Sequence, residues 1–182
     1  GFAGKVTSRL GTVSQNIPGG EIYQALEKGT IDAAEWVGPY DDLKLGFNKV
    51  APFYYYPGWW EGGPEVDFFI NNKAFDALSA ENKAIIEAAT HLAHTDMLAK
   101  YDALNPRALK QLVAAKTKVL PFPQTVLEAS FKASMEVFAE NDAKSPEWKK
   151  IYADMRNFQR DQILWFRFAE SRFDTFMSTR KL

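Results

Sequence analysis

Two segments of the sequence place carboxylates directly beside aromatic side chains. These are residues 35–42 (EWVGPYDD) and residues 54–61 (YYYPGWWE). Trp and Tyr rings offer an apolar wall with polar edges, which suits a small organic ligand. A carboxylate beside such a wall is costly to bury unless it meets a cation or hydrogen-bond donors. The pattern indicates a small-molecule site that contains Glu35. Aromatic packing at a hinge or core, with solvated acids, explains the same residues equally well.

Paired acids also suggest glycoside hydrolysis, in which one carboxyl group acts as acid and the other as base or nucleophile. Glu35 with Glu61, or Glu61 with Glu65, would be the candidate pairs. Acids are common in proteins and no further motif supports this chemistry. We therefore expect no glycoside turnover.

Two histidines lie three residues apart, His91 and His94, in a segment of helical pattern. This spacing can place two imidazoles on one metal ion. The sequence has no HExxH pattern and offers no third ligand beside them, so ordinary surface histidines are the simpler interpretation. Gly19 and Gly20 open a predicted helix, but without a GxGxxG or P-loop pattern they indicate a turn rather than a phosphate site.

The composition excludes several classes of function. The chain has 182 residues, with 22 basic and 23 acidic side chains and a formal net charge of −1, so it has no electrostatic basis for binding nucleic acid or an anionic membrane. It contains no cysteine, which removes disulfides, thiolate metal sites and cysteine nucleophiles. No apolar run approaches the roughly 18–20 residues of a membrane helix.

The first 37 residues alternate between helix and strand patterns, which is typical of an α/β unit with parallel strands. Because Glu35 comes near the end of a predicted buried strand, it would lie at the edge where open α/β sheets bind ligands. A further strand is predicted at 66–71. The predicted helices of this region are 3–10 and 21–28, and the predicted strands are 12–17 and 30–37.

The remainder of the chain is predicted to be mainly helical, and we divide it into two parts. Residues 1–120 form an α/β ligand-binding lobe with hinge segments, and residues 121–182 form a helical C-terminal region. Asn105-Pro106 should interrupt a long helix. The predicted elements are helices at 80–104, from 107 to about 115, 124–140 and 146–179, and a short strand at 117–120.

The last predicted helix is apolar on more than one face. Its early apolar residues recur every three or four positions, as for one buried stripe, but those from Ile163 to Phe168 surround most of its circumference. Such a helix needs cover from two sides. Another domain or subunit could supply that cover, and burial within the chain is an equal alternative.

Residues 18–36 (PGGEIYQALEKGTIDAAEW) resemble the solute-binding proteins of TRAP (tripartite ATP-independent periplasmic) transporters. Residues 37–40 (VGPY) and 54–59 (YYYPGW) narrow the resemblance to the branch that binds 2-oxo and 2-hydroxy acids such as pyruvate or lactate. The resemblance covers essentially the whole chain. It implies an α/β fold class: the C-terminal part of a two-lobed, Venus-flytrap periplasmic binding protein with a long C-terminal helix.

The resemblance also implies a function without catalysis. The protein would capture a small monocarboxylate in the periplasm and deliver it to a TRAP membrane permease. A sodium or calcium ion would bind with the ligand, held by Glu35, the Trp36 carbonyl and Glu61, which are the oxygen donors that hard cations prefer. Trp36, Trp59 and Glu61 would line the substrate site.

Two further implications concern assembly. Dimerisation through exchange of the long terminal helix occurs in this branch, so we expect a homodimer. Family members are about twice as long, and their preceding half carries a signal peptide and an arginine that pairs the ligand carboxylate. The alternative from another class is a self-associating module that binds no ligand.

Overall fold

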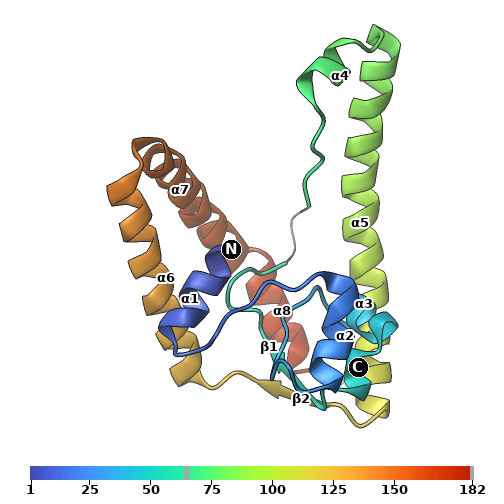
Figure 1. The fold of residues 1–182 in the computed structure, drawn as a ribbon, viewed down its shortest axis with the longest axis vertical. Coiled ribbons are helices and arrows are strands. Elements are labelled where there is room, and N and C mark those ends of the chain that lie inside the picture. The colour runs from blue at the N-terminus through green and yellow to red at the C-terminus, as the bar shows by residue number, and fades with distance from the viewer. Residues whose placement is uncertain (64–65, 181–182) are drawn as a thin grey trace. The chain divides into compact units, whose positions relative to one another are not determined.

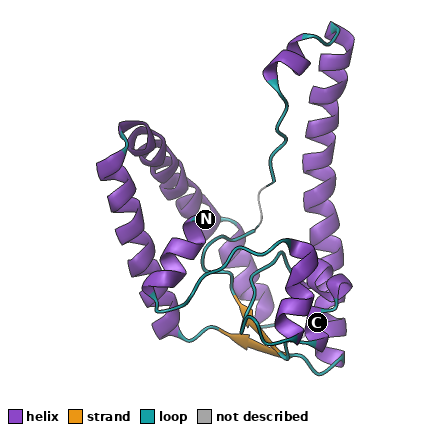
Figure 2. Cartoon of the chain, in the orientation of Figure 1, coloured by secondary structure: helices purple, strands orange, loops and turns teal. Residues whose placement is uncertain are grey.

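The computed structural model describes residues 1–63 and 66–180, and its secondary structure is mostly helical (Figures 1 and 2). The chain divides into two compact units. The first consists of residues 14–128 together with Gly1, and the second of residues 2–13 and 129–182.

The first unit is built around a pair of parallel strands and the lower part of a long helix. Strand β1 pairs with β2 in parallel, so that Tyr54 lies opposite Val119, but the parallel strands expected within residues 1–37 are absent from the structure. Helix α3 packs against α5. The elements are α2 (Gly19–Glu27), α3 (Pro39–Leu45), η1 (Phe47–Lys49), β1 (Phe53–Tyr56), α4 (Asn72–Asp76), α5 (Ala80–Ala114) and β2 (Lys118–Pro121), and α6 (Gln124–Lys144) begins in this unit.

Three predicted strands are wrong. Residues 12–17, 30–37 and 66–71 have irregular backbone that forms no ladder, and 30–37 contains bends. Their β-branched and apolar residues favour extended backbone, but a strand also requires a neighbouring strand to exchange hydrogen bonds with. Such a neighbour is not found among the described residues for these three segments.

The predicted interruption at Asn105-Pro106 is also wrong, because α5 continues through Pro106 as one helix of 35 residues. Proline removes one N–H from the helix ladder, which usually bends or ends a helix. Here the flanking turns are held by tertiary packing. The Asn105 side-chain oxygen accepts the Tyr40 backbone N–H at 3.0 Å, and Ala108 and Leu112 are buried. The helix begins at a Ser79 cap whose hydroxyl accepts the Asn82 N–H at 3.2 Å.

Helices are the only regular secondary structure in the described part of the second unit. It contains α1 (Phe2–Arg9), most of α6, α7 (Pro146–Phe168) and α8 (Glu170–Ser178). The last helix, predicted as continuous from 146 to 179, breaks at Ala169, where ψ is −92°. Ser145 caps α7 by accepting the Trp148 N–H at 3.1 Å, and Pro146 occupies the first turn, as the sequence predicts.

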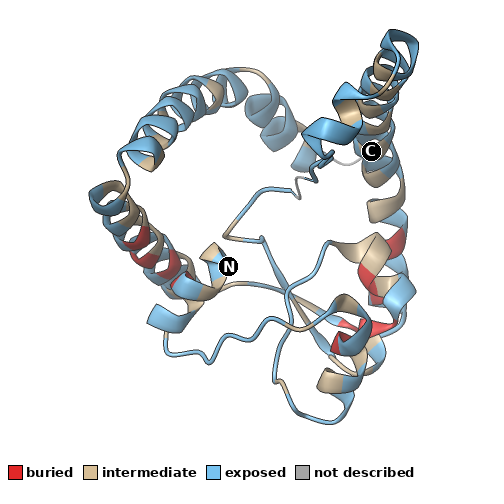
Figure 3. Cartoon of the chain, turned by 45° about the horizontal axis from the view of Figure 1, so that its top comes forward, coloured by how far each residue is buried: buried red, intermediate tan, exposed pale blue. Residues whose placement is uncertain are grey.

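An aromatic stack joins α1, α6 and α7 in this unit. The Phe138 ring lies between those of Phe2, at 4.7 Å between centroids, and Tyr152, at 4.5 Å, and Trp148 extends the stack. Val6 and Val137 are buried beside it, where α1 and α6 carry buried residues in Figure 3.

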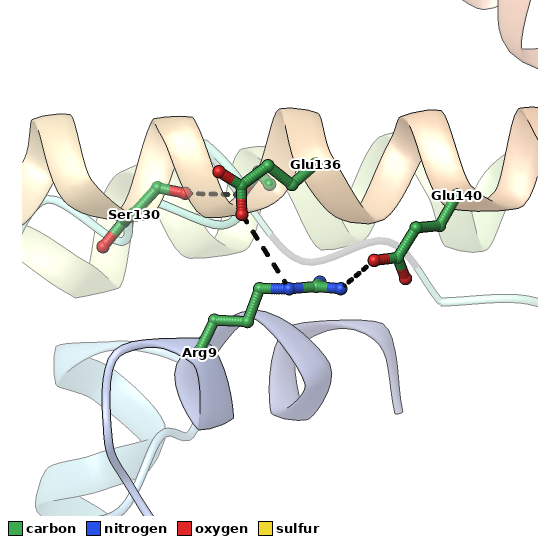
Figure 4. Close-up of polar contacts among 5 residues, drawn as sticks. Arg9, Ser130, Glu136 and Glu140 are labelled. Carbon is green, nitrogen blue, oxygen red and sulfur yellow. Dashed lines mark hydrogen bonds and ion pairs between the residues drawn. The ribbon is translucent and has the colours of Figure 1, made fainter.

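An ion cluster supports the same junction of α1 and α6. Arg9 of α1 hydrogen-bonds to Glu140, and its Nε lies 4.0 Å from a Glu136 carboxylate oxygen (Figure 4). The Arg9 guanidinium holds the pKa of Glu140 below its usual range. Exposed ion pairs add little stability, so the aromatic stack dominates this packing.

In the first unit, the start of α2 lies against the Trp36 indole. A Cβ placed on Gly19 would stand 3.1 Å from Trp36 Cζ2 and 3.2 Å from Cζ3, with Cη2 closer still. A Cβ on the neighbouring Gly20 would meet nothing within 4 Å. The Phe47 ring also packs edge-on to the indole, with 6.2 Å between centroids. The Trp36 indole therefore contacts both the N-terminal turn of α2 and Phe47.

This packing predicts opposite effects for the two glycines. Gly19→Ala should displace the indole and destabilise the chain, because the added methyl group overlaps the ring. Gly20→Ala should be neutral or stabilising by up to about 1 kcal/mol, because alanine favours helix over glycine. Urea unfolding with tryptophan emission as the signal compares them. The emission change caused by Gly19→Ala should vanish in a Trp36→Phe background. Equal stabilities for the two alanine variants would contradict the close contact between Gly19 and the Trp36 indole.

Candidate functional site

A cavity of about 990 Å³ lies within the first unit. One wall is the irregular segment 31–39 and another is residues 50–56, which include β1. Trp60, Leu112 and Phe122 complete parts of the lining. Burial of the long helix near Leu112 and pairing of β1 with β2 hold these walls in place.

The lining of this cavity is mostly apolar, and its charged residues are all acidic. It includes Asp32, Glu35 and Asp42, and the described residues that line it include no Lys, Arg or His. An anion that entered this cavity alone would meet only like charge. A cation would be attracted by all three carboxylates.

The surroundings of Glu35, the first acid of the predicted site, shift its pKa. Partial burial and the nearby Glu61 carboxylate raise the pKa of Glu35, and Asp42 adds a smaller repulsion. A hydrogen bond from the Trp60 indole N–H opposes these effects. The structure thus brings Glu35 and Glu61 close enough to interact.

The remaining predicted site residues occupy different positions around Glu35. Trp36 lines the cavity and is about one-third exposed, at 37%. Trp59 packs edge-on against Trp60, with ring centroids 4.9 Å apart, and it is Trp60 that the cavity lining includes. Glu61 is exposed and reaches the site through its charge on Glu35.

Two adjacent aspartates at the start of α3 each accept a tyrosine hydroxyl. Tyr54 Oη donates to Asp42 Oδ2 at 2.6 Å, and Tyr101 Oη donates to Asp41 Oδ2 at 2.7 Å. Burial raises the pKa of Asp42, opposed by the hydrogen bonds it accepts, and burial together with Asp42 raises the pKa of Tyr54. The hydrogen bond to Asp41 raises the pKa of Tyr101 to about 12. Both phenols therefore remain protonated donors.

The donor set fits a hard cation better than a softer metal. In the part of the chain that the structure describes, no three His, Cys, Asp or Glu side chains form a group that could hold a metal. His91 and His94 are both exposed on α5. A cation at Glu35 would thus need oxygen from carbonyl groups and from the ligand, which is ordinary coordination for sodium or calcium. Glu65, considered above as part of a carboxylate pair, lies outside the described residues.

Sequence reasoning missed several residues of the cavity. The sequence predicts Trp59 as a lining residue, whereas the cavity is lined by Trp60. No periodicity distinguishes two consecutive tryptophans in a loop. Asn48 lines the cavity with a buried amide oxygen that has no hydrogen-bond partner in the structure. The hydrogen bond between Tyr54 and Asp42 could not be predicted from the sequence, because it depends on how α3 and β1 lie relative to each other. The only sequence signal for these residues was that the two segments with adjacent acids and aromatic residues, 35–42 and 54–61, lie close together in the chain.

Comparison with known proteins identifies the family. Residues 1–144 match the model for bacterial extracellular solute-binding protein, family 7 (DctP). The chain is 48% identical, over 179 residues, to the monocarboxylate 2-oxoacid-binding periplasmic protein of Nostoc sp. strain PCC 7120. That alignment covers 98% of this chain and 49% of the relative, so the chain spans about half the length of the relative it matches.

Two solved structures share the fold. A TRAP transporter solute-binding protein from Bordetella bronchiseptica, a mixed-occupancy dimer with calcium and picolinate in its active site, is 51% identical with a TM-score of 0.93 over 97% of this chain and 53% of its own. One from Pseudoalteromonas atlantica, with bound sodium and pyruvate, is 39% identical with a TM-score of 0.90 over 100% of this chain and 54% of its own.

These similarities confirm the α/β fold class and the resemblance inferred from residues 18–40 and 54–59. Within the described residues, no helix is long and apolar enough to cross a membrane. The family binds solutes and is not a family of enzymes, so the carboxylate-pair hydrolase is not supported. The chain belongs to the DctP family, the solute-binding proteins of TRAP transporters.

Proposed function

We propose that this chain supplies the cation-binding part of a site for a small 2-oxo or 2-hydroxy monocarboxylate. The observation that carries the proposal is the acidic cavity. Its carboxylates face no basic side chain among the described residues that line it. Partial burial and the nearby Glu61 carboxylate raise the pKa of Glu35.

A bound cation would remove this electrostatic conflict. It would offset the negative charge of Glu35 and Glu61 and offer open coordination positions to the ligand carboxylate. The carboxylate of Glu35, the backbone carbonyl of Trp36 and the carboxylate of Glu61 would hold sodium or calcium. The Bordetella relative contains calcium and the Pseudoalteromonas relative contains sodium, so the same donor set serves either ion in our proposal.

The ligand class follows from the same coordination chemistry. A 2-oxo or 2-hydroxy acid offers a carboxylate oxygen and a second oxygen on the adjacent carbon, and these can chelate one cation. Trp36 and Trp59 would flank the short carbon chain of a pyruvate- or lactate-like molecule. The 2-oxoacid specificity of the Nostoc relative and the pyruvate of the Pseudoalteromonas relative support this class.

The transport role follows from the family. We place the protein in the periplasm, where it would capture the acid and deliver it to a TRAP membrane permease. The Nostoc relative, described as periplasmic, supports this location. Since the chain spans about half of its relatives, the remainder of the binding site is expected from the part that they have in addition.

The helices α7 and α8 support a dimer through the C-terminal region. Ile151, Met155 and Phe158 form an exposed apolar stripe on α7, with Phe158 65% exposed. Their spacing of four and three residues places them on one face of the helix. The Bordetella relative is a dimer, so a second copy is the proposed occupant of this stripe.

Glu35→Gln tests the proposed site directly. It removes the charge with little change of shape, so calcium affinity should fall at least about tenfold, equivalent to about 1.4 kcal/mol. Isothermal titration of calcium, and then of pyruvate with calcium present, measures both losses. Glu27→Gln, an equal change on an exposed residue of α2, is the control. Equal affinity in the Glu35 variant and the wild-type chain would exclude Glu35 as a ligand.

The raised pKa of Glu35 predicts a pH dependence of cation binding. The cation needs the ionised carboxylate, and burial with repulsion from Glu61 makes the proton bind more tightly than to an ordinary glutamate. Calcium affinity should therefore fall as pH is lowered, approaching about tenfold per pH unit below the pKa of Glu35. Titrations from about pH 7.5 downward should show a steeper fall of affinity in the wild-type chain than with Glu35→Gln. A pH-independent affinity would contradict the assignment.

Phe158→Glu should convert the dimer into monomers, because it places a charge in the apolar stripe. Light scattering at micromolar concentration measures the mass. Ala153→Glu adds the same charge on another side of α7, since the two positions are 500° apart at about 100° per residue, and should leave the dimer intact. A monomeric wild-type chain would contradict the proposed contact. Retained calcium binding by the monomeric variant would separate ligand capture from self-association.

A further inference from the structure

The Trp36 indole contacts two other parts of the first unit as well as the cavity. It lines the cavity, packs edge-on against the Phe47 ring and meets the first turn of α2 at Gly19. Phe47 is buried, at 8% exposed, and lines the cavity too. The packing that holds the indole therefore also shapes the wall that a ligand would meet.

Gly19 leaves open the space that the outer end of the indole occupies. A Cβ at position 19 would overlap Trp36 Cη2 and would stand 3.1 Å from Cζ2 and 3.2 Å from Cζ3. These three carbons form the outer part of the six-membered ring. Carbon atoms pack at about 3.5–4.0 Å, so any side chain at position 19 would displace the ring from its present position.

The backbone at Gly19 does not itself require glycine. Positive φ angles are found among the described glycines at Gly11, Gly29 and Gly46, and not at Gly19. Gly19 is the first residue of α2, where alanine would favour the helix more than glycine does. The contact with the Trp36 indole is thus the feature of the structure that excludes a side chain at position 19.

A side chain at position 19 would act on the cavity through the indole. Gly19 itself is not among the described residues that line the cavity, whereas Trp36 is. Displacing the outer ring from α2 would therefore move part of the cavity wall. The neighbouring Gly20 offers a matched comparison, because a Cβ there would meet nothing within 4 Å.

We propose that Gly19 is a specificity-determining residue, which sets the length of the carbon chain that the site accepts. By giving the outer ring of Trp36 a place against α2, it keeps that ring out of the space that the ligand chain needs. This inference rests on the proposed function, in which Trp36 flanks the carbon chain of a 2-oxo acid. It assigns the limit on ligand size to a residue outside the cavity lining.

The indole ring and the backbone carbonyl of Trp36 have separate roles in this proposal. The cation is held by that carbonyl and by the carboxylates of Glu35 and Glu61, none of which belongs to the ring. Displacing the ring should therefore change the affinity for long acids more than the affinity for pyruvate or for the cation. General loss of structure would weaken all three, so the ratio of affinities distinguishes a change of specificity from destabilisation.

The test is isothermal titration of the 182-residue chain and of Gly19→Ala and Gly20→Ala. Calcium is titrated alone, and pyruvate and 2-oxopentanoate are titrated with calcium present. One methylene group in an apolar pocket changes discrimination roughly tenfold or more, so Gly19→Ala should lower the affinity for 2-oxopentanoate relative to pyruvate at least about tenfold. Gly20→Ala should keep this ratio within about threefold of the wild-type value, and both variants should keep calcium affinity within the same range.

Trp36→Phe keeps the test decisive if Gly19→Ala does not fold. Phenylalanine lacks the outer ring atoms that meet Gly19, so this variant should shift the ratio of affinities toward 2-oxopentanoate at least about fivefold. An unchanged ratio in this variant would contradict the indole as the limit on chain length. In the Trp36→Phe background, Gly19→Ala should leave the ratio unchanged, because the added methyl group no longer overlaps a ring.

The outcomes separate this inference from the proposed function. An unchanged ratio in Gly19→Ala, or a shift toward the longer acid, would overturn the role of Gly19 alone. An equal shift in Gly20→Ala, or the same shift in the Trp36→Phe background, would overturn it as well, since the effect would not depend on the ring. If the wild-type chain binds neither acid with calcium present, the proposed function fails and the role of Gly19 fails with it.

Discussion

The structure of the first unit depends on how it tolerates carboxylates gathered in one cavity without a basic partner among the described lining. Glu35 and Asp42 both have raised pKa values because burial disfavours their charged forms. Hydrogen bonds offset part of this cost, from the Trp60 indole to Glu35 and from Tyr54 to Asp42. The offset is incomplete, and the remaining unfavourable free energy is what a cation can relieve on binding.

The surrounding elements hold the segments that carry these carboxylates in place. Strand β1 carries Tyr54 and is held by β2, while α5 receives the start of α3 through Asn105. The N-terminal turn of α2 approaches the Trp36 indole so closely that Gly19 leaves no room for a side chain. The contact with Gly19 acts on the irregular segment that carries Glu35, and the contacts with Tyr40 and Asp42 hold the helix that directly follows it.

The sequence predicts the helices and the family well and the strands poorly, for identifiable reasons. Helix starts such as Ser145-Pro146 are local, and the structure confirms that one. The segment 30–37 has a strand's composition, but strands need partners that a local pattern cannot supply. Pro106 shows the converse, because tertiary packing keeps α5 intact where local chemistry favours a break. At the site, the interaction of Glu35 with Glu61 was anticipated, whereas the roles of Trp60 and Asp42 depend on packing between distant segments.

The same electrostatics couples cation and ligand in the proposed site. A cation bound at Glu35 makes the potential that a carboxylate ligand would meet less negative, so each should strengthen the binding of the other. Thermodynamic linkage makes this coupling reciprocal. A chain whose cavity is acidic therefore need not recognise an anion with its own side chains. It can instead bind a cation whose remaining coordination positions fit a carboxylate and the oxygen beside it.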